Sequence, residues 1–403
     1  MCIRDRVRRI EDRWIGFGLS SRLWKRYRST RLSAGRVQSV VLDWIVERFL
    51  EWKKGLHYYF RISTPAFNFI IDFPVKKREE AEEIAREIEK SPVKVVRSEV
   101  EEREIKPLPP YTTDSMLSDA TTLPGFSAPK VMQLAQDLFE SGLITYHRTD
   151  STRVSTAGIK VARDYLEEKC PEEFTPRTWH AEGAHECIRP VKPLDASRLV
   201  EMVREGVVRA KLTAEHIRLY SLIFNRFIAS QMKPAKVQVA KVQVEVAGRK
   251  AEIEGLVGIL KEGFARFYRR NLPRRISLSS RELPVKSVFF WLDSEKELYT
   301  QAEVIREMRT KRIGRPSTYA VIINKLFERG YVKEVKGKLI PTRLGITVSR
   351  FLKKNYGKFV SESRTAELYE KMEKVEKGEE DYQEVLRRTF QELEEIVGGL
   401  SKG

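Results

Sequence analysis

Hydrophobic and polar positions change their period several times along the chain. Residues 24–52 carry apolar side chains at helical spacing, with Leu42, Ile45, Val46 and Phe49 on one face, which predicts a helix-rich segment. From residue 58 the period changes, and the chain becomes rich in aromatic and β-branched residues, which predicts strands.

The same reasoning assigns elements to the rest of the chain. Strands are expected at 58–62, 67–73, 93–100, within 234–259 and at 288–291, the last of them. Helices are expected at 79–90, 113–143 with an interruption at 123–125, 156–170 and 213–231, and they dominate from 301 to the end. Residues 105–110 are proline-rich and predict an extended hinge. This order predicts an α+β, mainly helical fold in which one domain is inserted into another.

The net charge of the chain indicates what kind of partner it binds. The 403 residues hold 75 Lys and Arg against 57 Asp and Glu, a net charge of +18. Such an excess favours a polyanion, and nucleic acid is a better match than a membrane because no basic amphipathic helix stands out. The basic excess is concentrated in residues 1–54, whereas 361–403 are acidic. Abundant charge with only five Asn and nine Gln resembles the composition of thermophile proteins.

Location is inferred from features that the sequence lacks. It has neither a signal peptide nor an apolar run long enough for a membrane helix, so we expect a cytoplasmic protein without a membrane partner. Three cysteines without pairable spacing fit a reducing compartment. Residues 1–6 join poorly to the segment that begins at Val7 and look like a cloning or assembly scar, which suggests that the natural chain begins further upstream.

The most informative stretch is Gly142–Arg153, in which Tyr146 is followed by His147 and Arg148. A phenol is a weak nucleophile at neutral pH because its pKa is about 10. A nearby guanidinium favours the phenolate and stabilises a phosphoryl group under attack. An alternative interpretation is that Tyr146 ends a buried strand and that Arg148 pairs with Asp150.

Three other motifs offer groups that bind phosphate. Ser33–Gln38 supplies a hydroxyl, small residues and a guanidinium, although Ser33 could equally cap a helix. Gly314–Thr318 forms a turn into a helix whose N-terminus attracts phosphate together with Arg315. In the third motif, His185 with Glu182 and Glu186 has the composition of a metal site, but carboxylates so close to Arg189 are expected to pair with it.

These motifs, with Leu123–Ala128, resemble in the same order the signatures of type IA DNA topoisomerases, over roughly residues 7–395. The resemblance implies that Tyr146 becomes linked to a 5′ phosphate, that Arg148 stabilises the pentacovalent phosphorus, and that His185 forms a hydrogen bond near the scissile phosphate. It also implies contacts with single-stranded and duplex DNA. The residues concerned are Ser33, Ala34, Gly35, Arg36, Val37, Gln38, Thr149, Asp150, Ser151, Arg189, Arg315, Ser317 and Thr318.

Several details are most similar to the topoisomerase half of reverse gyrases. They are residues 8–17, His147, Cys187 beside His185-Glu186, and Arg364-Thr365 followed by Met372-Glu373. The family's Asp-x-Asp cluster and an ATP-binding loop are both missing from this sequence. The resemblance therefore implies that this chain is a C-terminal fragment that lacks the Toprim domain. The fragment itself is expected to bind neither metal nor nucleotide. Mg²⁺ would enter through that absent domain, and ATP through an absent helicase-like one.

The resemblance also implies an architecture, a monomeric toroid with nested domains. Residues 7–57 and 295–403 would form a helical DNA-binding domain, 58–107 and 232–294 a β-rich arch, and 108–231 the helical domain that carries the nucleophile. A simple relaxing topoisomerase I, or a DNA-binding fragment without turnover, remains as an alternative function.

Overall fold

The computed structural model describes residues 3–179, 185–278 and 280–397. It is 48% helical and 20% strand, which confirms the mainly helical α+β class. The chain divides into two compact units. Unit 1 comprises residues 1–51, 117–132 and 298–403, and unit 2 comprises residues 52–116 and 133–297. This division does not test the boundaries of the five expected segments, which stay a prediction.

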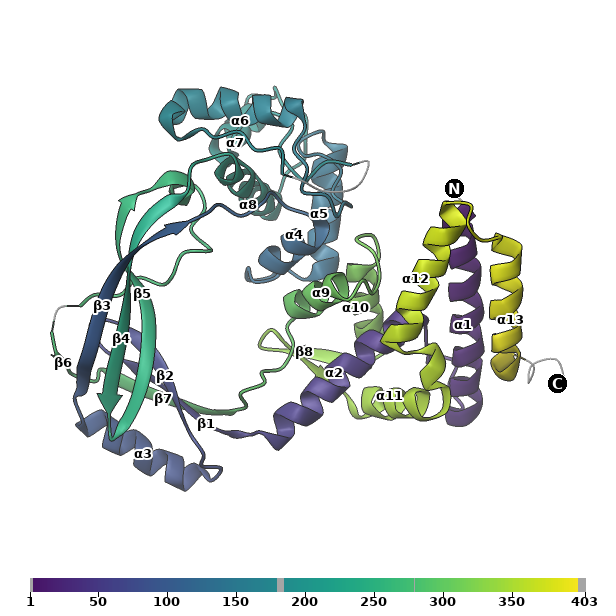
Figure 1. Ribbon diagram of the computed structural model, residues 1–403, viewed down its shortest axis with the longest axis horizontal. Helices are drawn as coiled ribbons and strands as arrows, with labels where there is room; N and C mark the ends of the chain where they lie inside the picture. Colours follow the sequence, from purple (N-terminus) through teal and green to yellow (C-terminus); the bar gives the residue numbers. More distant parts are fainter. Residues whose placement is uncertain (1–2, 180–184, 279, 398–403) are drawn as a thin grey trace. The chain divides into compact units, whose positions relative to one another are not determined.

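Unit 2 contains two antiparallel sheets. One has the order β2-β1-β7, formed by β1 (His57–Ser63), β2 (Asn68–Phe73) and β7 (Ser287–Asp293). The other has the order β5-β4-β3-β6, formed by β3 (Val93–Ile105), β4 (Ala235–Val246), β5 (Arg249–Lys261) and β6 (Glu282–Leu283). Pairing of β1 with β7, and of β3 with β4, reunites segments far apart in the sequence, as the nested order predicts (Figure 1).

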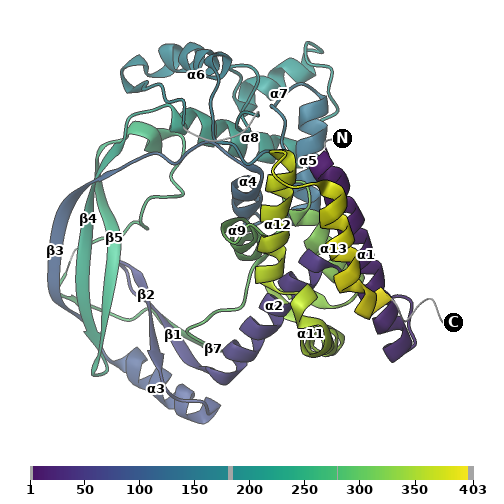
Figure 2. The same cartoon turned by 45° about the vertical axis from the view of Figure 1, so that its right-hand side comes forward.

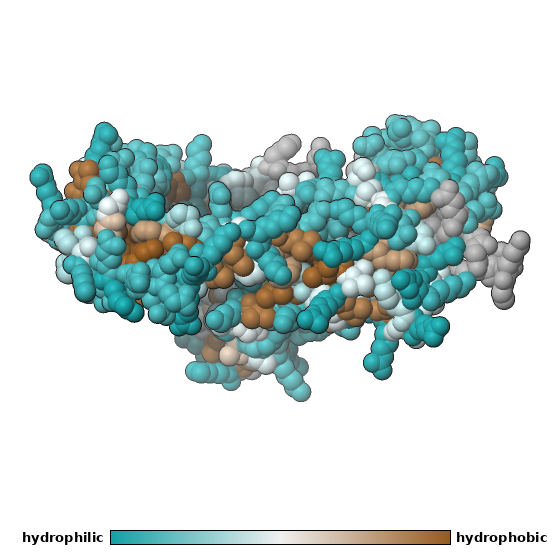
Figure 3. Space-filling view, turned by 90° about the horizontal axis from the view of Figure 1, so that it is seen from below, coloured by the Kyte–Doolittle hydropathy of each residue, from teal (hydrophilic) through white to brown (hydrophobic). Residues whose placement is uncertain are grey.

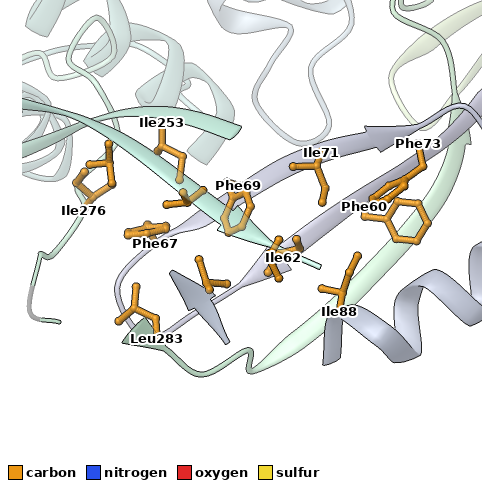
Figure 4. Packing of buried hydrophobic residues seen from close by; sticks show 14 of the residues in the cluster. Phe60, Ile62, Phe67, Phe69, Ile71, Phe73, Ile88, Ile253, Ile276 and Leu283 are labelled. Atoms are coloured by element: carbon orange, nitrogen blue, oxygen red, sulfur yellow. The ribbon is translucent and has the colours of Figure 1, made fainter. Parts of the chain in front are cut away.

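A shared apolar core joins the two sheets to helix α3 (Arg78–Lys90). Alternate residues of β2 are buried, so Phe69, Ile71 and Phe73 enter this core while the residues between them are exposed. Figure 4 shows Phe60 and Ile88 in the same cluster. Burial of each such side chain contributes about 1.5–3 kcal/mol, so this cluster holds the sheets and α3 together.

Helices form the rest of unit 2, the unit that contains Tyr146. They are α6 (Thr156–Lys169), α7 (Ala196–Arg204), α8 (Ala214–Ser230), and the short 3₁₀ helices η1 (Pro171–Glu173) and η2 (Gly263–Arg266). The helices α4 (Thr113–Ala120) and α5 (Ala128–Glu140) are each divided between the two units. The short helix α7 was not expected from the sequence. It carries an N-terminal cap, since the Asp195 side chain accepts a hydrogen bond from Arg198 N.

Unit 1 is built mainly from helices. They are α1 (Ile3–Tyr27), most of α2 (Arg36–Lys54), α9 (Gln301–Thr310), α10 (Tyr319–Glu328), α11 (Arg343–Tyr356), α12 (Glu362–Glu376), α13 (Tyr382–Val397), and the 3₁₀ helix η3 (Gly357–Phe359). In Figures 1 and 2, α12 and α13 lie beside α1. Val7, Val375 and Val385 pack together there, which fixes the three helices against one another.

One expectation for unit 1 is wrong, because the strand at residues 287–293 is not the last. A hairpin of β8 (Val332–Val335) and β9 (Lys338–Pro341) comes after it. Its turn residues Lys336 and Gly337 both have positive φ, 51° and 76°, the conformation that tight two-residue hairpins require. Three of the four side chains of β8 are exposed and two of them are charged, so the apolar alternation that marks a strand is weak here.

Hydrophobic residues at the surface form patches within a mostly hydrophilic face, as Figure 3 shows. Within the described ranges, no helix combines the length and apolar character that crossing a membrane requires.

Candidate active site

Tyr146 lies in an irregular segment between α5 and α6, and its side chain is 38% exposed. Exposure alternates along this segment, so that Arg148 and Asp150 are also exposed while His147 and Thr149 are buried. The interpretation of Tyr146 as the end of a buried strand is therefore wrong. Among the described residues, Arg148 makes no ion pair with Asp150 either; its Nε donates to His147 Nε2 at 3.3 Å.

Buried hydroxyl groups fix this segment from both sides. The Thr113 hydroxyl, at the start of α4, lies 2.8 Å from His147 O and 3.0 Å from Thr149 O. It also accepts a hydrogen bond from Thr149 N at 2.9 Å. On the other side, the Thr145 hydroxyl donates to Cys187 O at 2.7 Å and accepts from Arg189 N at 3.0 Å. The backbone around Tyr146 is thus held before any substrate binds.

A hollow of about 350 Å³ opens beside the Tyr146 ring. Its lining residues are Thr145, Tyr146, Arg153, Ser155, His185 and Glu186. The rings of Tyr146 and His185 lie with their centroids 5.4 Å apart, although the two residues are distant in sequence. Phe139, on α5, packs edge-on against the Tyr146 ring at 5.4 Å. The structure therefore brings together two of the three residues expected to be catalytic, with Arg148 attached to the same segment.

Glu186 and Arg189 form a buried pair behind this hollow. Arg189 Nε and Nη2 donate to the two carboxylate oxygens of Glu186 at 2.9 and 2.8 Å, and the Ser155 hydroxyl donates to Glu186 at 2.7 Å. Burial by itself would raise the pKa of Glu186, but these hydrogen bonds outweigh it and the pKa is lowered. Glu186 is thus ionised and neutralises Arg189, as the sequence predicts, whereas Glu182 lies outside the described residues.

The pair also constrains the helix beside it. A Cβ atom at Gly158, in the first turn of α6, would lie 2.7 Å from Arg189 Nε and 2.8 Å from Val154 Cγ1. Only glycine leaves room for the buried guanidinium at this position. Arg189, which is 6% exposed, is therefore enclosed by α6 and its own carboxylate partner.

His147 is completely buried, with its ring against Tyr146 and Phe139 at centroid distances of 5.6 and 6.1 Å. Burial, and then the positive charge of Arg148, lower its pKa to about 4. The imidazole is therefore uncharged at neutral pH.

In unit 1, a second set of expected residues lines one groove of about 520 Å³. The residues expected from the sequence that line it are Ser33, Ala34, Gly35, Arg36, Val37, Gln38, Gly314, Arg315 and Thr318. The loop before α2 is held by Tyr331, whose hydroxyl accepts from Ser33 N and donates to Ser33 O, both at 2.9 Å. Two motifs far apart in sequence thus form one surface.

Arg36 differs from the other basic residues of the groove because its side chain is buried. Its Nε pairs with Asp12 at 3.0 Å, and its Nη1 lies 3.4 Å from Thr365 O. Because α2 begins at Arg36, the interpretation of Ser33 as the cap of this helix is wrong.

Arg315 is half-buried in the turn that leads into α10, where the Thr318 hydroxyl accepts a hydrogen bond from Arg315 N at 2.9 Å. Gly314 has a φ of 88°, which favours glycine there. Ser317, next in this motif, is exposed.

Four further basic residues line the groove. Arg9 and Arg13 on α1 lie in the basic segment 1–54, whereas Lys325 and Arg329 at the C-terminal end of α10 were not expected from the sequence. Within each pair the residues are one helical turn apart, so both members lie on the same helix face. This four-residue spacing of basic residues was one indication of the groove's charge in the sequence. It does not single out a DNA-binding surface, because such pairs are common on solvated helices.

Comparison with known proteins agrees with this geometry. The family model described as "DNA topoisomerase" matches residues 4–387. The chain is 45% identical to a reverse gyrase of Pyrococcus furiosus, over 96% of this chain and 32% of that protein. It is 45% identical to reverse gyrase 1 of Aquifex aeolicus, over 97% and 34% of the two proteins. The structure resembles full-length topoisomerase I from Thermotoga maritima with a TM-score of 0.70 and 31% identity, over 98% of this chain and 68% of that one. The chain spans about a third of the length of the curated relatives it matches.

Proposed function

The chain belongs to the type IA DNA topoisomerase family, and from that membership we propose that it is the DNA-gate portion of an enzyme that breaks one strand through a 5′-phosphotyrosine. A second strand then passes through the break, which is resealed. The identity of 45% to reverse gyrases favours that branch of the family over a simple relaxing enzyme.

The observation that carries this proposal is the exposed phenol of Tyr146, held beside His185 in a hollow on a pre-formed backbone. The segment is fixed by buried neighbours while the phenol itself is partly open to solvent, where a phosphodiester can reach it.

In the proposed reaction, the phenolic oxygen of Tyr146, which is accessible to solvent, loses its proton to water and forms a bond to phosphorus. The bond from phosphorus to the 3′ oxygen breaks, and that oxygen takes up a proton from water. Resealing reverses both changes, so no net hydrolysis occurs. The Arg148 guanidinium stabilises charge on the phosphoryl oxygens, a contribution of about 3–4 kcal/mol for one well-placed donor. His185 donates a hydrogen bond to the phosphate or the adjacent DNA backbone.

For DNA binding, we propose that the groove of unit 1 follows the sugar-phosphate backbone through Ser33, Arg315, Thr318 and the residues beside them. Its exposed Arg9, Arg13, Lys325 and Arg329 side chains provide the positive charge. Asp150 is exposed beside Tyr146, where it is available to DNA. Thr149, Ser151, Arg36 and Arg189 are buried, so we propose that they act by shaping the surfaces that DNA touches.

The domain division expected from the sequence is part of the proposal. Residues 108–231 would move as a body that carries Tyr146, with hinges near Pro107 and Pro234. Support comes from the arch, whose sheets are made of strands from both 58–107 and 232–294.

Members of this family generally depend on Mg²⁺. The described residues hold no group of three His, Cys, Asp or Glu side chains that could bind a metal ion. We propose that a metal-binding domain of the parent enzyme supplies this ion, and that this chain alone does not relax DNA. Incubating the chain with supercoiled plasmid and Mg²⁺ tests this proposal, since relaxation by the chain alone would show that a further metal domain is not required.

The test of the nucleophile uses the enzyme that contains this chain, with Tyr146→Phe and a matched Tyr59→Phe control on β1. Removal of the Tyr146 hydroxyl should abolish covalent capture of a labelled single-stranded oligonucleotide and leave its equilibrium binding unchanged. Tyr59→Phe should retain both. A covalent adduct that persists in Tyr146→Phe would place the nucleophile elsewhere.

A further inference from the structure

His147 has no role in the proposed reaction, yet it lies between the nucleophile and the guanidinium. Its ring contacts Tyr146, and its Nε2 is 3.3 Å from Arg148 Nε. The residue is 0% exposed, so this contact is made inside the protein rather than in solvent.

The direction of the hydrogen bond is set by the chemistry of the two groups. An arginine Nε can only donate, so Nε2 of His147 must be the unprotonated acceptor and the ring proton must be on Nδ1. His147 Nδ1 is buried and has no hydrogen-bond partner among the described residues. The charged groups that act on the ring are Arg148 and, more weakly and in the opposite direction, Glu140.

The bond at Nε restrains the Arg148 guanidinium without occupying its terminal nitrogens. Arg148 is exposed, and within the described part of the chain its Nη1 and Nη2 atoms have no polar partner. These two nitrogens are the pair that binds phosphate oxygens in a bidentate arrangement. The imidazole is itself fixed, because Thr113 holds the His147 backbone and Phe139 packs against the ring.

We propose that His147 is a positioning residue, an uncharged acceptor that orients the Arg148 guanidinium toward the phosphate attacked by Tyr146. This inference rests on the proposed function, since it assumes that Arg148 binds the scissile phosphate. A leucine or methionine at this position would fill the space but would leave Arg148 Nε without an acceptor, so the long side chain would sample several rotamers.

The test measures single-turnover cleavage of a labelled single-stranded oligonucleotide by the enzyme that contains this chain. His147→Leu should slow cleavage about 10- to 100-fold, the cost of a misplaced catalytic group, with oligonucleotide binding unchanged. His147→Gln, whose amide oxygen can accept from Arg148, should recover most of the rate. A double variant, His147→Leu with Arg148→Ala, should be no slower than Arg148→Ala alone, because both changes remove the same interaction.

A matched substitution, His57→Leu on β1, should leave the cleavage rate unchanged. Losses that simply add in the double variant, or full activity in His147→Leu, would overturn the inference. Covalent capture that survives in Tyr146→Phe would instead refute the proposed function, so the two failures are distinguishable.

A second measurement does not depend on whether the variants fold. The chain has five histidines, so ¹⁵N-histidine labelling gives a small set of resolvable imidazole signals. At about pH 6, where an ordinary histidine with a pKa of about 6.5 is mostly protonated, His147 should remain the uncharged Nδ1–H tautomer. A protonated His147 ring, or an Nε2–H tautomer, would contradict the inference.

Discussion

Glu186→Gln should loosen the segment that carries Tyr146, because it removes the charge that neutralises a buried arginine. Breaking a fully buried ion pair costs about 3–5 kcal/mol, since the remaining charge has no compensation. The Arg189 side chain is 7% exposed and that of Glu186 is 24% exposed, so water can partly solvate the site after the change. We therefore expect a loss of about 2–3 kcal/mol in the free energy of local opening.

Hydrogen exchange measures this loss locally, which suits a chain with more than one compact unit. The amides to monitor are Thr145 N, bonded to Arg189 O at 2.9 Å, and Arg189 N, bonded to the Thr145 hydroxyl. Their protection at neutral pH should fall by about 30- to 150-fold, which corresponds to the expected energy. Glu99→Gln, in an exposed pair with Arg97 on β3, is the matched control and should change protection little.

The pH dependence gives the sign of the effect. The folded protein lowers the pKa of Glu186. The ionised carboxylate therefore stabilises the fold fully when the pH is above the ordinary pKa of 4.5, and this stability is lost as the pH falls through the lower pKa of the folded state. The difference between wild type and Glu186→Gln should therefore shrink under acid conditions. A difference that stays constant with pH, or a neutral-pH loss no larger than that of Glu99→Gln, would refute the reasoning.

Two further predictions concern packing and DNA binding. Gly158→Ala should destabilise the protein by about 1–3 kcal/mol, because the added Cβ meets Arg189 and Val154. A thermal melt checks this, with Gly357→Ala, at a position with negative φ and nothing within 4 Å of the added Cβ, as the control without crowding. Lys325→Gln in the groove should weaken single-stranded DNA binding at low salt and reduce the slope of log K against log salt by about 0.7. The matched change Lys296→Gln, outside the groove, should preserve that slope, and an equal reduction there would argue against the groove as the binding surface.

Local pattern was sufficient to predict much of the fold. The aromatic and β-branched residues of Phe67–Phe73 indicated β2, and the buried ones among them face the core of unit 2. The hairpin at 332–341 was missed because its strands are short and half of β8 is charged, so little in its hydropathy separated it from a loop.

The candidate site was predicted less completely, because burial and pairing depend on distant segments. Arg36 is expected to contact phosphate, and the sequence did not indicate that Asp12 on α1 would pair with it and bury its side chain. The proximity of Tyr146 and His185 was expected from the resemblance to the family, because nothing in their sequence spacing indicates that their rings meet. The interaction of His147 with Arg148 is local in sequence, yet which way two adjacent side chains point depends on the backbone that Thr113 fixes.

The central claim is tested most directly by identifying the residue that becomes linked to DNA. The enzyme that contains this chain would be trapped on a short single-stranded oligonucleotide, digested with protease and nuclease, and its nucleotide-bearing peptide sequenced by mass spectrometry. We expect one modified residue, Tyr146, joined to a 5′ phosphate. A nucleotide attached to any other residue, or to a 3′ phosphate, would contradict the account.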